Sequence, residues 1–393
     1  MRVIGLISGT SHDAIESAAV DLRLEGEALV ADVMGRRSTP YETGLRKRLL
    51  EALPPARTTL EDVCILDTEI GRAFAAAAAA QVADLPRSAA DLVCSHGQTV
   101  YHWVDGSRAL GTLQLGQPAW IAERTGLPVV ADLRPRDIAA GGQGAPLASI
   151  LDVLLLGGSD VPTAALNLGG IANITVLRPG AAPIAYDTGP ASALIDAAVV
   201  ELTDGRESYD RDGAGARRGT VDPALLGRLL EEPYYRLPAP KTTGKELFNA
   251  AYLRAHVDGG ATSLDDLLAT LTALTVETVA RELERHEVER VVASGGGTRN
   301  PALMDGLRER LPVVSQETFD DVAGVASEAK EAVMVALIGF LTVNGLAGAV
   351  ASCTGADRGA ILGSITPGER PLVLPPPAGV AVRRLELRAG VER

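Results

Sequence analysis

The first of four short segments suited to phosphate chemistry is Ser8-Gly9-Thr10-Ser11-His12-Asp13, which directly follows an apolar run beginning at Val3. Its hydroxyls and successive backbone N–H groups are donors that suit an anion. Asp13 could hold a hydrated Mg²⁺, an ion that keeps several waters and needs few protein carboxylates. A polar β-turn without a ligand is the alternative. A Walker A loop is excluded, because no Gly-Lys-Ser/Thr occurs there.

Two glycine segments lie farther along the chain. Gly169-Gly170 joins two apolar runs within Asn167 to Thr175 and predicts a tight hairpin, whose bare backbone can approach a polyphosphate. Gly295-Gly296-Gly297 follows the run Val291 to Ala293, and Asn300-Pro301 then predicts a helix with Asn300 as its N-cap. Three glycines would let a flat ring lie against the backbone. A turn without a ligand is the alternative for both segments.

The fourth segment is Tyr186-Asp187-Thr188-Gly189-Pro190, which predicts an acidic residue at the end of a strand, a turn, and Pro190 at a helix start. A carboxylate in that place could act as a general base on a hydroxyl or a water. The alternative is that Asp187 only caps the helix.

Histidines cluster around Gly97-Gln98-Thr99, with His96 before them and His102 after. No third ligand at a metal spacing accompanies them, so a polar contact with a ligand is favoured over a zinc site. Ser95, His96 and Asp187 could suggest a hydrolytic triad, but the chain has no Gly-x-Ser-x-Gly elbow at the serine.

The elements that must position these residues alternate between strands and helices, which predicts an α/β protein. The helical patterns are Thr68 to Ala83, Ala191 to Leu202 and Leu264 to Arg285. The apolar runs that predict strands are Val3 to Ile7, Leu92 to Cys94, Val129 to Ala131, Ala164 to Leu168, Ile171 to Val176 and Val291 to Ala293.

Composition narrows the class of protein. The chain has 393 residues, enough for two domains. Its 37 Lys and Arg against 50 Asp and Glu give a formal charge of −13, which opposes binding to nucleic acid or anionic lipid. Three scattered cysteines fit a reducing cytoplasm and argue against a disulfide framework.

The strongest membrane candidate is the uncharged stretch Ala332 to Ala351. Its first part, to Val343, reads better as a buried helix, because Asn344-Gly345 supplies a stop signal inside the window. An exposed apolar face on this helix would favour a homodimer.

Several strings together resemble one family, that of anhydro-N-acetylmuramic acid kinase, within the superfamily of actin, heat-shock chaperone ATPases and sugar kinases. The resemblance covers nearly the whole chain, and the two longest strings are the most specific. The strings are Ser8 to Ser11, Ser95 to Thr99, Ala139 to Leu147, Asn167 to Thr175, Asp187 to Pro190, Thr243 to Phe248 and Lys330 to Ala332.

The resemblance implies a two-domain actin-like ATPase fold, ribonuclease H-like, with ATP and sugar in the cleft between the domains. We place the first domain at 1–145, completed by about 348–393, and the second at 146–347; the turn-rich Gly141 to Pro146 suggests the first boundary. An ordinary surface loop is the alternative for that stretch.

The implied reaction needs ATP and Mg²⁺. The γ-phosphoryl group passes to O6 of 1,6-anhydro-N-acetylmuramic acid while water opens the anhydro bridge, which gives N-acetylmuramic acid 6-phosphate in cell-wall sugar recycling. Asp187 matches the general base. The residues implied to contact ATP are Gly9, Thr10, Ser11, His12, Asp13 (also the metal ligand), Gly169, Gly170, Gly295, Gly296 and Gly297. Those implied on the sugar side are Ser95, His96, Gln98, Arg134, Asp137 and Glu331.

The sequence departs from the family pattern at a few positions. His12 and Ala14 stand where the family usually has Leu and Gly, Gln117 where it commonly has Asp, and Ala191-Ser192 where it commonly has Gly-Asn. Ala14 would restrict the turn if its position needed a positive φ. Two other functions stay open: a same-fold kinase for another amino sugar, and an ATP-binding switch without sugar turnover.

Overall fold

The structure is a computed structural model, and it describes residues 1–393 except 86–89, 107, 245, 258–261 and 391–393. The chain divides into two compact units, Met1–Gly158 with Ala323–Arg393 and Ser159–Val322. The sequence analysis placed these boundaries near 145 and 347. The first boundary lies later, after Gly158, because α5 (Ser149–Leu156) contacts β13 (Arg384–Ala389) of the first unit. The second boundary lies earlier, before Ala323, because α13 (Lys330–Val343) contacts β1 (Arg2–Ser8).

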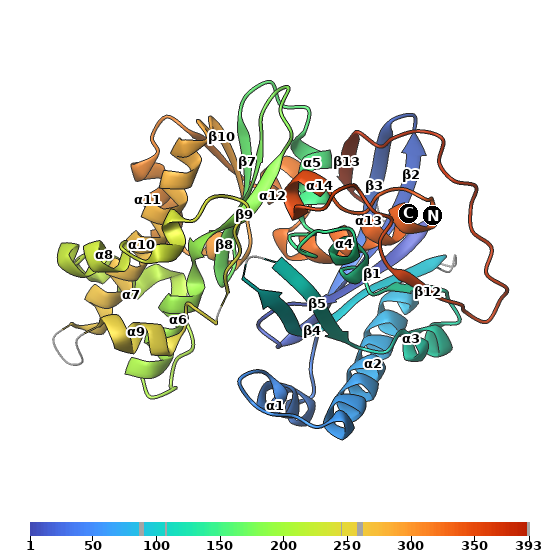
Figure 1. Ribbon diagram of the computed structural model, residues 1–393, viewed down its shortest axis with the longest axis horizontal. Helices are drawn as coiled ribbons and strands as arrows, with labels where there is room; N and C mark the ends of the chain where they lie inside the picture. The colour runs from blue at the N-terminus through green and yellow to red at the C-terminus, as the bar shows by residue number, and fades with distance from the viewer. Residues whose placement is uncertain (86–89, 107, 245, 258–261, 391–393) are drawn as a thin grey trace. The chain divides into compact units, whose positions relative to one another are not determined.

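The first unit is built on one mixed sheet, shown in Figure 1, with the strand order β12-β6-β4-β1-β2-β3-β13 and β5 paired to β4. The strands β1, β4 and β6 are parallel, so their carboxyl ends meet at one edge of the sheet. The remaining strands are β2 (Ala14–Glu25), β3 (Ala28–Pro40), β4 (Leu92–Asp105), β5 (Arg108–Leu115), β6 (Val129–Ala131) and β12 (Ser364–Thr366).

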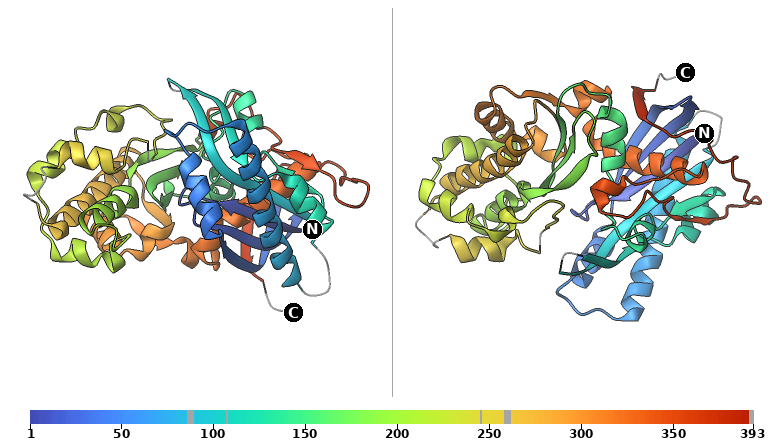
Figure 2. Two further views of the ribbon diagram at one scale, coloured as in Figure 1. Left: turned by 90° about the horizontal axis from the view of Figure 1, so that it is seen from below. Right: turned by 45° about the horizontal axis from the view of Figure 1, so that its top comes forward.

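Two helices pack on opposite faces of this sheet, because side chains alternate along β1. Ile4 and Leu6 join a buried cluster with Phe74 of α2 (Leu60–Ala83). Gly5 faces α13, and a Cβ at Gly5 would lie 2.0 Å from the carbonyl oxygen of Ala332, so only glycine lets the helix come this close. Figures 1 and 2 show α13, in orange, against the blue strands.

Helix α13 ends as the sequence predicts. It stops at Val343, and Gly345 adopts a φ of +71° just beyond it. Every residue of the helix except Glu331 is buried, so the helix does not present the exposed apolar face that would favour a homodimer. Among the residues that the structure describes, no helix is long and apolar enough to cross a membrane.

Shorter helices complete the first unit. α2 begins at Leu60 rather than Thr68, because Thr59 and Asp62 form a capping box at its start. The others are α1 (Thr43–Ala52), α3 (Pro118–Thr125), α4 (Pro135–Ala139) and α14 (Ala351–Thr354).

The second unit holds a five-stranded sheet in the order β11-β10-β7-β8-β9. Strands β7 (Thr163–Leu168) and β8 (Ile171–Leu177) form the predicted hairpin around Gly169-Gly170. The other strands are β9 (Ile184–Pro190), β10 (Arg290–Ser294) and β11 (Ser315–Thr318).

Long helices pack around this second sheet. α10 (Leu264–Arg285) has the predicted bounds and contacts α6 (Ser192–Leu202), α11 (Pro301–Arg310) and β9. The smaller helices are α7 (Ala214–Arg218), α8 (Pro223–Leu229) and α9 (Ala250–His256), and α12 (Phe319–Ala323) follows β11.

One predicted helix start is wrong. Pro190 ends strand β9, and α6 begins at Ser192, so Asp187 lies within a strand and does not cap the helix. Pro190 is tolerated there because it is the last residue of β9, the edge strand of the sheet.

Candidate active site

The turn from Gly9 to Asp13 connects β1 to β2 at the carboxyl edge of the first sheet. Gln98 supports it by donating from Nε2 to the Gly9 carbonyl at 3.3 Å, and Arg46 Nε donates to the His12 carbonyl at 2.8 Å. Glu331, exposed in the first turn of α13, approaches the same turn: a Cβ on Gly9 would lie 3.9 Å from its Oε2. The sequence-predicted residues of the turn and Glu331 are therefore brought together.

Asp13 is exposed at the end of this turn. Its Oδ1 accepts hydrogen bonds from Ser11 Oγ at 2.5 Å and from the Ala14 N–H at 2.9 Å. A single exposed carboxylate beside a serine hydroxyl is an all-oxygen donor set, which fits a hydrated Mg²⁺ that takes its remaining ligands from phosphates and water.

The strain in this turn falls on His12 and not on Ala14. His12 has a φ of +53°, whereas Ala14 is the first residue of β2 and has no positive φ. Alanine in place of the family's glycine therefore does not restrict the turn. The left-handed conformation at His12 is the kind of local strain that is often found at binding turns.

His96 and Arg134 form a fixed pair behind the sheet edge. His96 Nδ1 lies 3.0 Å from the Gly97 carbonyl, and Arg134 Nε donates to His96 Nε2 at 2.8 Å. Because Nε2 accepts, Nδ1 carries the proton. Burial and the Arg134 charge lower the pKa of His96 to about 3, so the ring stays neutral. Both ring nitrogens are used, so His96 orients Arg134 and is no acid or base.

The Arg134 guanidinium also donates from Nη1 to the Gly144 carbonyl at 2.6 Å. Burial lowers the pKa of Arg134 to about 10, against the opposing effect of Glu331 and Asp137, so the group stays charged at neutral pH. No carboxylate of the described residues forms an ion pair with it within 4 Å, although Glu331 and Asp137 act on it from farther away. A half-buried cation without a direct ion pair suits an anionic ligand.

Asp137 supports the loop at 141–146 from inside. Its carboxylate is fully buried and accepts from the Gly144 N–H and from Thr354 Oγ1, both at 2.8 Å. Both oxygens are occupied, so Asp137 shapes the loop rather than offering a free contact to a sugar. The loop belongs to the first unit for the same reason.

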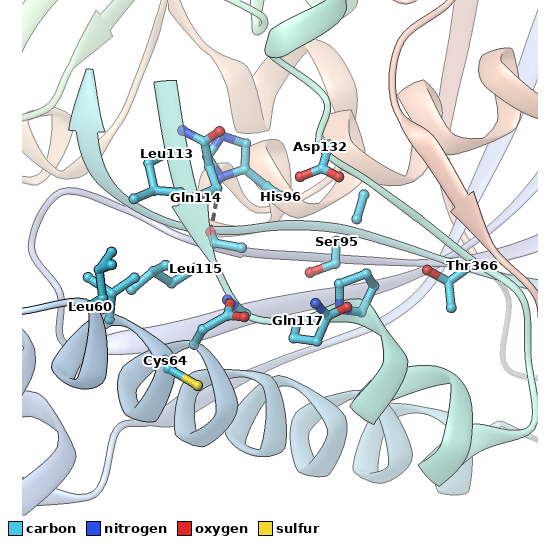
Figure 3. Close-up of a pocket in the computed structure, with 16 residues that line it drawn as sticks. Leu60, Cys64, Ser95, His96, Leu113, Gln114, Leu115, Gln117, Asp132 and Thr366 are labelled. Atoms are coloured by element: carbon cyan, nitrogen blue, oxygen red, sulfur yellow. Dashed lines mark hydrogen bonds between the residues drawn. The ribbon is translucent and has the colours of Figure 1, made fainter. Parts of the chain in front are cut away.

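A cavity of about 520 Å³ in the first unit opens beside β4, as Figure 3 shows. Ser95 and His96 line it, together with Asp67, Asp132 and Gln117, which the sequence analysis did not assign to a site. The Ser95 hydroxyl is buried and accepts or donates no hydrogen bond among the described residues, so it is a group that a ligand could satisfy. Burial, and secondly the charge of Asp67, raise the pKa of Asp132, which also has a φ of +55°.

A signal for Asp132 was present in the sequence. It directly follows the apolar run Val129 to Ala131, which forms β6 parallel to β4, and ligands commonly bind at the carboxyl ends of parallel strands. Gln117, which stands where the family commonly has Asp, lines the same cavity. Its side chain caps α3 by accepting a hydrogen bond from the Ala119 N–H at 3.3 Å.

The glycine segments of the second unit lie against each other. The carbonyls of Gly169 and Gly170 accept N–H groups from the start of α6, including Ser192 N–H at 3.1 Å. A Cβ on Gly295 or Gly297 would lie within 3 Å of Asn167 or Leu168, so these two glycines allow packing against the hairpin. At Gly296 an added Cβ would contact only the Arg299 side chain, at 3.9 Å. Of the three glycines, Gly296 therefore has the most free space beside its Cα. Asn300 caps α11 as predicted, accepting from the Ala302 N–H at 3.0 Å.

Asp187 is a half-buried carboxylate of the second unit. Its Oδ2 accepts from Thr242 Oγ1 at 2.8 Å and from the Thr243 N–H at 2.9 Å. Burial raises the pKa of Asp187 to about 6, although both hydrogen bonds lower it; the charge of Glu246 acts in the same direction as burial. A carboxylate with a pKa near neutrality, and with Oδ1 unbonded by any described residue, is suited to accept a proton.

The threonines that hold Asp187 were not assigned a role from the sequence. Thr243 begins the string Thr243 to Phe248, and Thr242 directly precedes it. The string contributes to the family resemblance, but its residue types do not indicate a role for either threonine. Lys245 of that string lies outside the described residues.

The fold and these groups define a two-unit α/β protein with a polar turn at the carboxyl edge of one sheet and a carboxylate of raised pKa beside the other. A model of the family "Anhydro-N-acetylmuramic acid kinase" matches residues 1–368. The chain belongs to this family.

Named relatives agree over the full length. The chain is 57% identical over 391 residues to "Anhydro-N-acetylmuramic acid kinase" of Streptomyces coelicolor, covering 99% of this chain and 100% of the relative. It is 53% identical over 396 residues to the protein of the same name from Rhodococcus erythropolis, covering 98% and 100%.

Solved structures give only distant likenesses. One is the ADPNP-bound activator of 2-hydroxyisocaproyl-CoA dehydratase from Clostridium difficile, at 13% identity and a TM-score of 0.39, covering 86% of this chain and 94% of that chain. Another is a ROK family glucokinase from Streptomyces griseus, at 13% identity and 0.37, covering 86% and 99%. Likeness at this level carries no argument about ligands.

Proposed function

We propose that the chain is a cytoplasmic ATP-dependent kinase that hydrolytically opens 1,6-anhydro-N-acetylmuramic acid and phosphorylates O6, in cell-wall sugar recycling. Water adds to C1, the C1–O6 bond breaks, and O6 takes the γ-phosphoryl group of ATP. The products are N-acetylmuramic acid 6-phosphate and ADP, and one proton is released from the water. The observation that carries the proposal is Asp187, a carboxylate with a pKa near 6 in a chain that belongs to this kinase family.

In this mechanism the first unit supplies donors for the phosphates. The N–H groups of Gly9 to Ser11 and the Thr10 hydroxyl bind phosphate oxygens, while the Ser11 hydroxyl orients the Asp13 carboxylate, which would hold Mg²⁺. The ion, when bound, neutralises charge on the transferred phosphoryl group. In the second unit Gly169, Gly170 and Gly296 contact the nucleotide, while Gly295 and Gly297 keep the loop packed against the hairpin.

Arg134 binds the negative end of the sugar. Muramic acid carries a lactyl carboxylate, and the Arg134 guanidinium is charged, half-buried and oriented by His96. A planar guanidinium matches a carboxylate well. His96, Gln98 and Asp137 then act on the sugar indirectly, by fixing Arg134, the phosphate turn and the neighbouring loop, while Ser95 and Glu331 remain direct contacts.

Asp187 takes the proton of the attacking water. Phosphoryl transfer needs mainly positioning and charge neutralisation, whereas the water needs a proton acceptor. The hydrogen bonds from Thr242 and Thr243 fix the orientation of the carboxylate. Since only the deprotonated form accepts a proton, turnover falls as the pH drops below about 6.

The test is ADP release by the pure protein with ATP and Mg²⁺, with the anhydro sugar, with N-acetylmuramic acid, and with neither. We expect release that depends on the anhydro sugar and a product heavier by one phosphoryl group plus one water in the mass spectrum. Turnover of the open sugar alone would indicate an ordinary amino-sugar kinase. ATP binding with no sugar-dependent release would indicate a switch.

A further inference from the structure

Lys241 and Glu282 form a buried ion pair in the second unit, next to the segment that holds Asp187. The Lys241 Nζ lies 3.0 Å from Glu282 Oε1, and the two side chains are 3% and 6% exposed. Lys241 Nζ also donates to the Tyr235 carbonyl at 3.2 Å. Burying two charges is costly and stabilises a fold little compared with apolar packing, so such a pair is often better explained by what it positions.

The main chain of Lys241 is tied to Asp187 itself. The Asp187 N–H donates to the Lys241 carbonyl at 3.1 Å, and the next two residues, Thr242 and Thr243, provide both hydrogen bonds to the carboxylate. Residues 241–243 lie in neither a helix nor a strand. The Lys241 side chain therefore anchors an irregular segment that holds the Asp187 carboxylate by two hydrogen bonds.

Glu282 joins the strand of Asp187 to the same anchor. Its Oε2 accepts from the hydroxyl of Tyr186, the residue before Asp187, at 3.0 Å, and its Oε1 takes Lys241. Tyr234 donates its hydroxyl to the Asp187 carbonyl at 2.7 Å, and its ring lies 5.1 Å from the Lys241 ammonium. One carboxylate on α10 thus holds both sides of the contact between β9 and the segment 241–243.

We propose that Lys241 and Glu282 are positioning residues for the reaction, whose ion pair holds residues 241–243 against β9 and so fixes the Asp187 carboxylate in one orientation. The proposal rests on the proposed function, in which Asp187 is the base. Loss of the pair frees Thr242 and Thr243 to leave Oδ2. A misplacement of about 1 Å at a reacting group can cost roughly 100-fold in rate.

The first experiment compares Lys241→Met with Lys241→Arg. We expect Lys241→Met to lower kcat by about 10- to 100-fold with the KM for the anhydro sugar within about threefold, and Lys241→Arg to recover much of the loss. The acid limb of the kcat profile should move to higher pH in Lys241→Met, because two hydrogen bonds that lower the pKa of Asp187 are lost while the charge of Glu246 remains.

A second variant guards against loss of the fold. Lys241→Met combined with Glu282→Gln removes both charges and leaves an amide oxygen for the Tyr186 hydroxyl, so no charge is buried alone. Arg281→Gln is the matched control, since Arg281 precedes Glu282 on α10, is exposed, and among the described residues forms an ion pair with the half-buried Glu277 only. The double variant should show the lowered kcat and the shifted limb, and the control neither. A folded double variant with wild-type kcat and limb overturns the proposal.

A double-mutant cycle with Asp187→Asn separates this proposal from the function on which it rests. If Lys241 acts through Asp187, adding Lys241→Met to Asp187→Asn lowers kcat no further. Losses that multiply overturn the positioning role while leaving Asp187 as the base. Full turnover by Asp187→Asn overturns the base role itself, whatever Lys241→Met does.

Discussion

Among the residues that the structure describes, each of the two units buries one lysine–carboxylate pair, and the pairs differ in what they join. In the first unit Lys330 Nζ lies 2.8 Å from Asp152 Oδ1, which links the start of α13 to α5. In the second unit the Lys241–Glu282 pair links an irregular segment to α10. Both pairs are more than nine-tenths buried at the side chains.

The difference lies in what else holds the lysine in place. Lys330 begins a helix of fourteen residues that the sheet, the closely packed Gly5 and a buried apolar face already fix. Lys241 has no helix or strand of its own, and its segment carries two donors to Asp187. A buried ion pair on a well-packed helix thus contributes mainly to the fold, whereas one on an irregular segment can set the geometry of a site.

The sharpest way to break this comparison is a matched pair of carboxylate-to-amide changes, Glu282→Gln and Asp152→Asn. Each removes the carboxylate charge that faces a buried lysine, so we expect each to lose about 3–5 kcal/mol of unfolding free energy in chemical denaturation. Only Glu282→Gln should also lower kcat under conditions where both variants are folded. An equal loss of kcat in both would show that the two pairs do the same job.

Arg134→Met tests the anion site of the first unit. Losing a charged hydrogen-bonding partner costs about 1.5–3 kcal/mol, so we expect the KM for the anhydro sugar to rise about 10- to 100-fold with little change in the KM for ATP. The measurement is steady-state kinetics with each substrate varied in turn. An unchanged KM for the sugar would remove Arg134 from the substrate's carboxylate.

Gly5→Ala tests how closely α13 is packed on the first sheet. The added methyl would lie 2.0 Å from the Ala332 carbonyl oxygen, so the helix must shift, and we expect a loss of about 1–3 kcal/mol. Gly227→Ala in α8 is the control, because a Cβ there meets nothing within 4 Å, and it should gain up to about 1 kcal/mol as a helix residue. Denaturation of both variants checks the signs, and a neutral Gly5→Ala would contradict the close packing.

The smallest effect is expected for Ala14→Gly. Ala14 is extended in β2, so restoring the family's usual glycine should change kcat by less than about twofold and cost roughly 0.5–1 kcal/mol of strand stability. Steady-state kinetics and denaturation measure both. A large gain in kcat would show that alanine restricts the phosphate turn after all.

The sequence was informative wherever the signal was local. The strand Val129–Ala131, the helix Leu264–Arg285, the Gly169-Gly170 hairpin and the Asn300 cap all follow from periodicity or turn residues within a few positions. Pro190 misled because its meaning depends on whether its strand lies at a sheet edge, which is a property of the whole sheet.

Hydrogen bonds and burial that involve residues far apart in the chain could not be predicted from the sequence. Asp137 reads as a free acidic residue until Thr354, 217 positions away, donates to it, and with that contact the loop at 141–146 joins the first unit. The same holds for Asp187: its place in the chain marks it as a candidate base, but its raised pKa depends on burial in the folded unit. Asp187 could be named as a candidate from the sequence, whereas Thr242 and Thr243, which hold its carboxylate, could not. The division of the named candidates into contacts and supports also depends on the fold.

The most direct test of the account is single-turnover kinetics of Asp187→Asn on 1,6-anhydro-N-acetylmuramic acid beside a measurement of its affinity for ATP. We predict that opening of the anhydro bridge and phosphorylation fall together by about 10²- to 10⁴-fold, the usual contribution of a general base, while ATP binding stays within a few-fold. Undiminished turnover would contradict the account, because no proton acceptor would then be needed at Asp187.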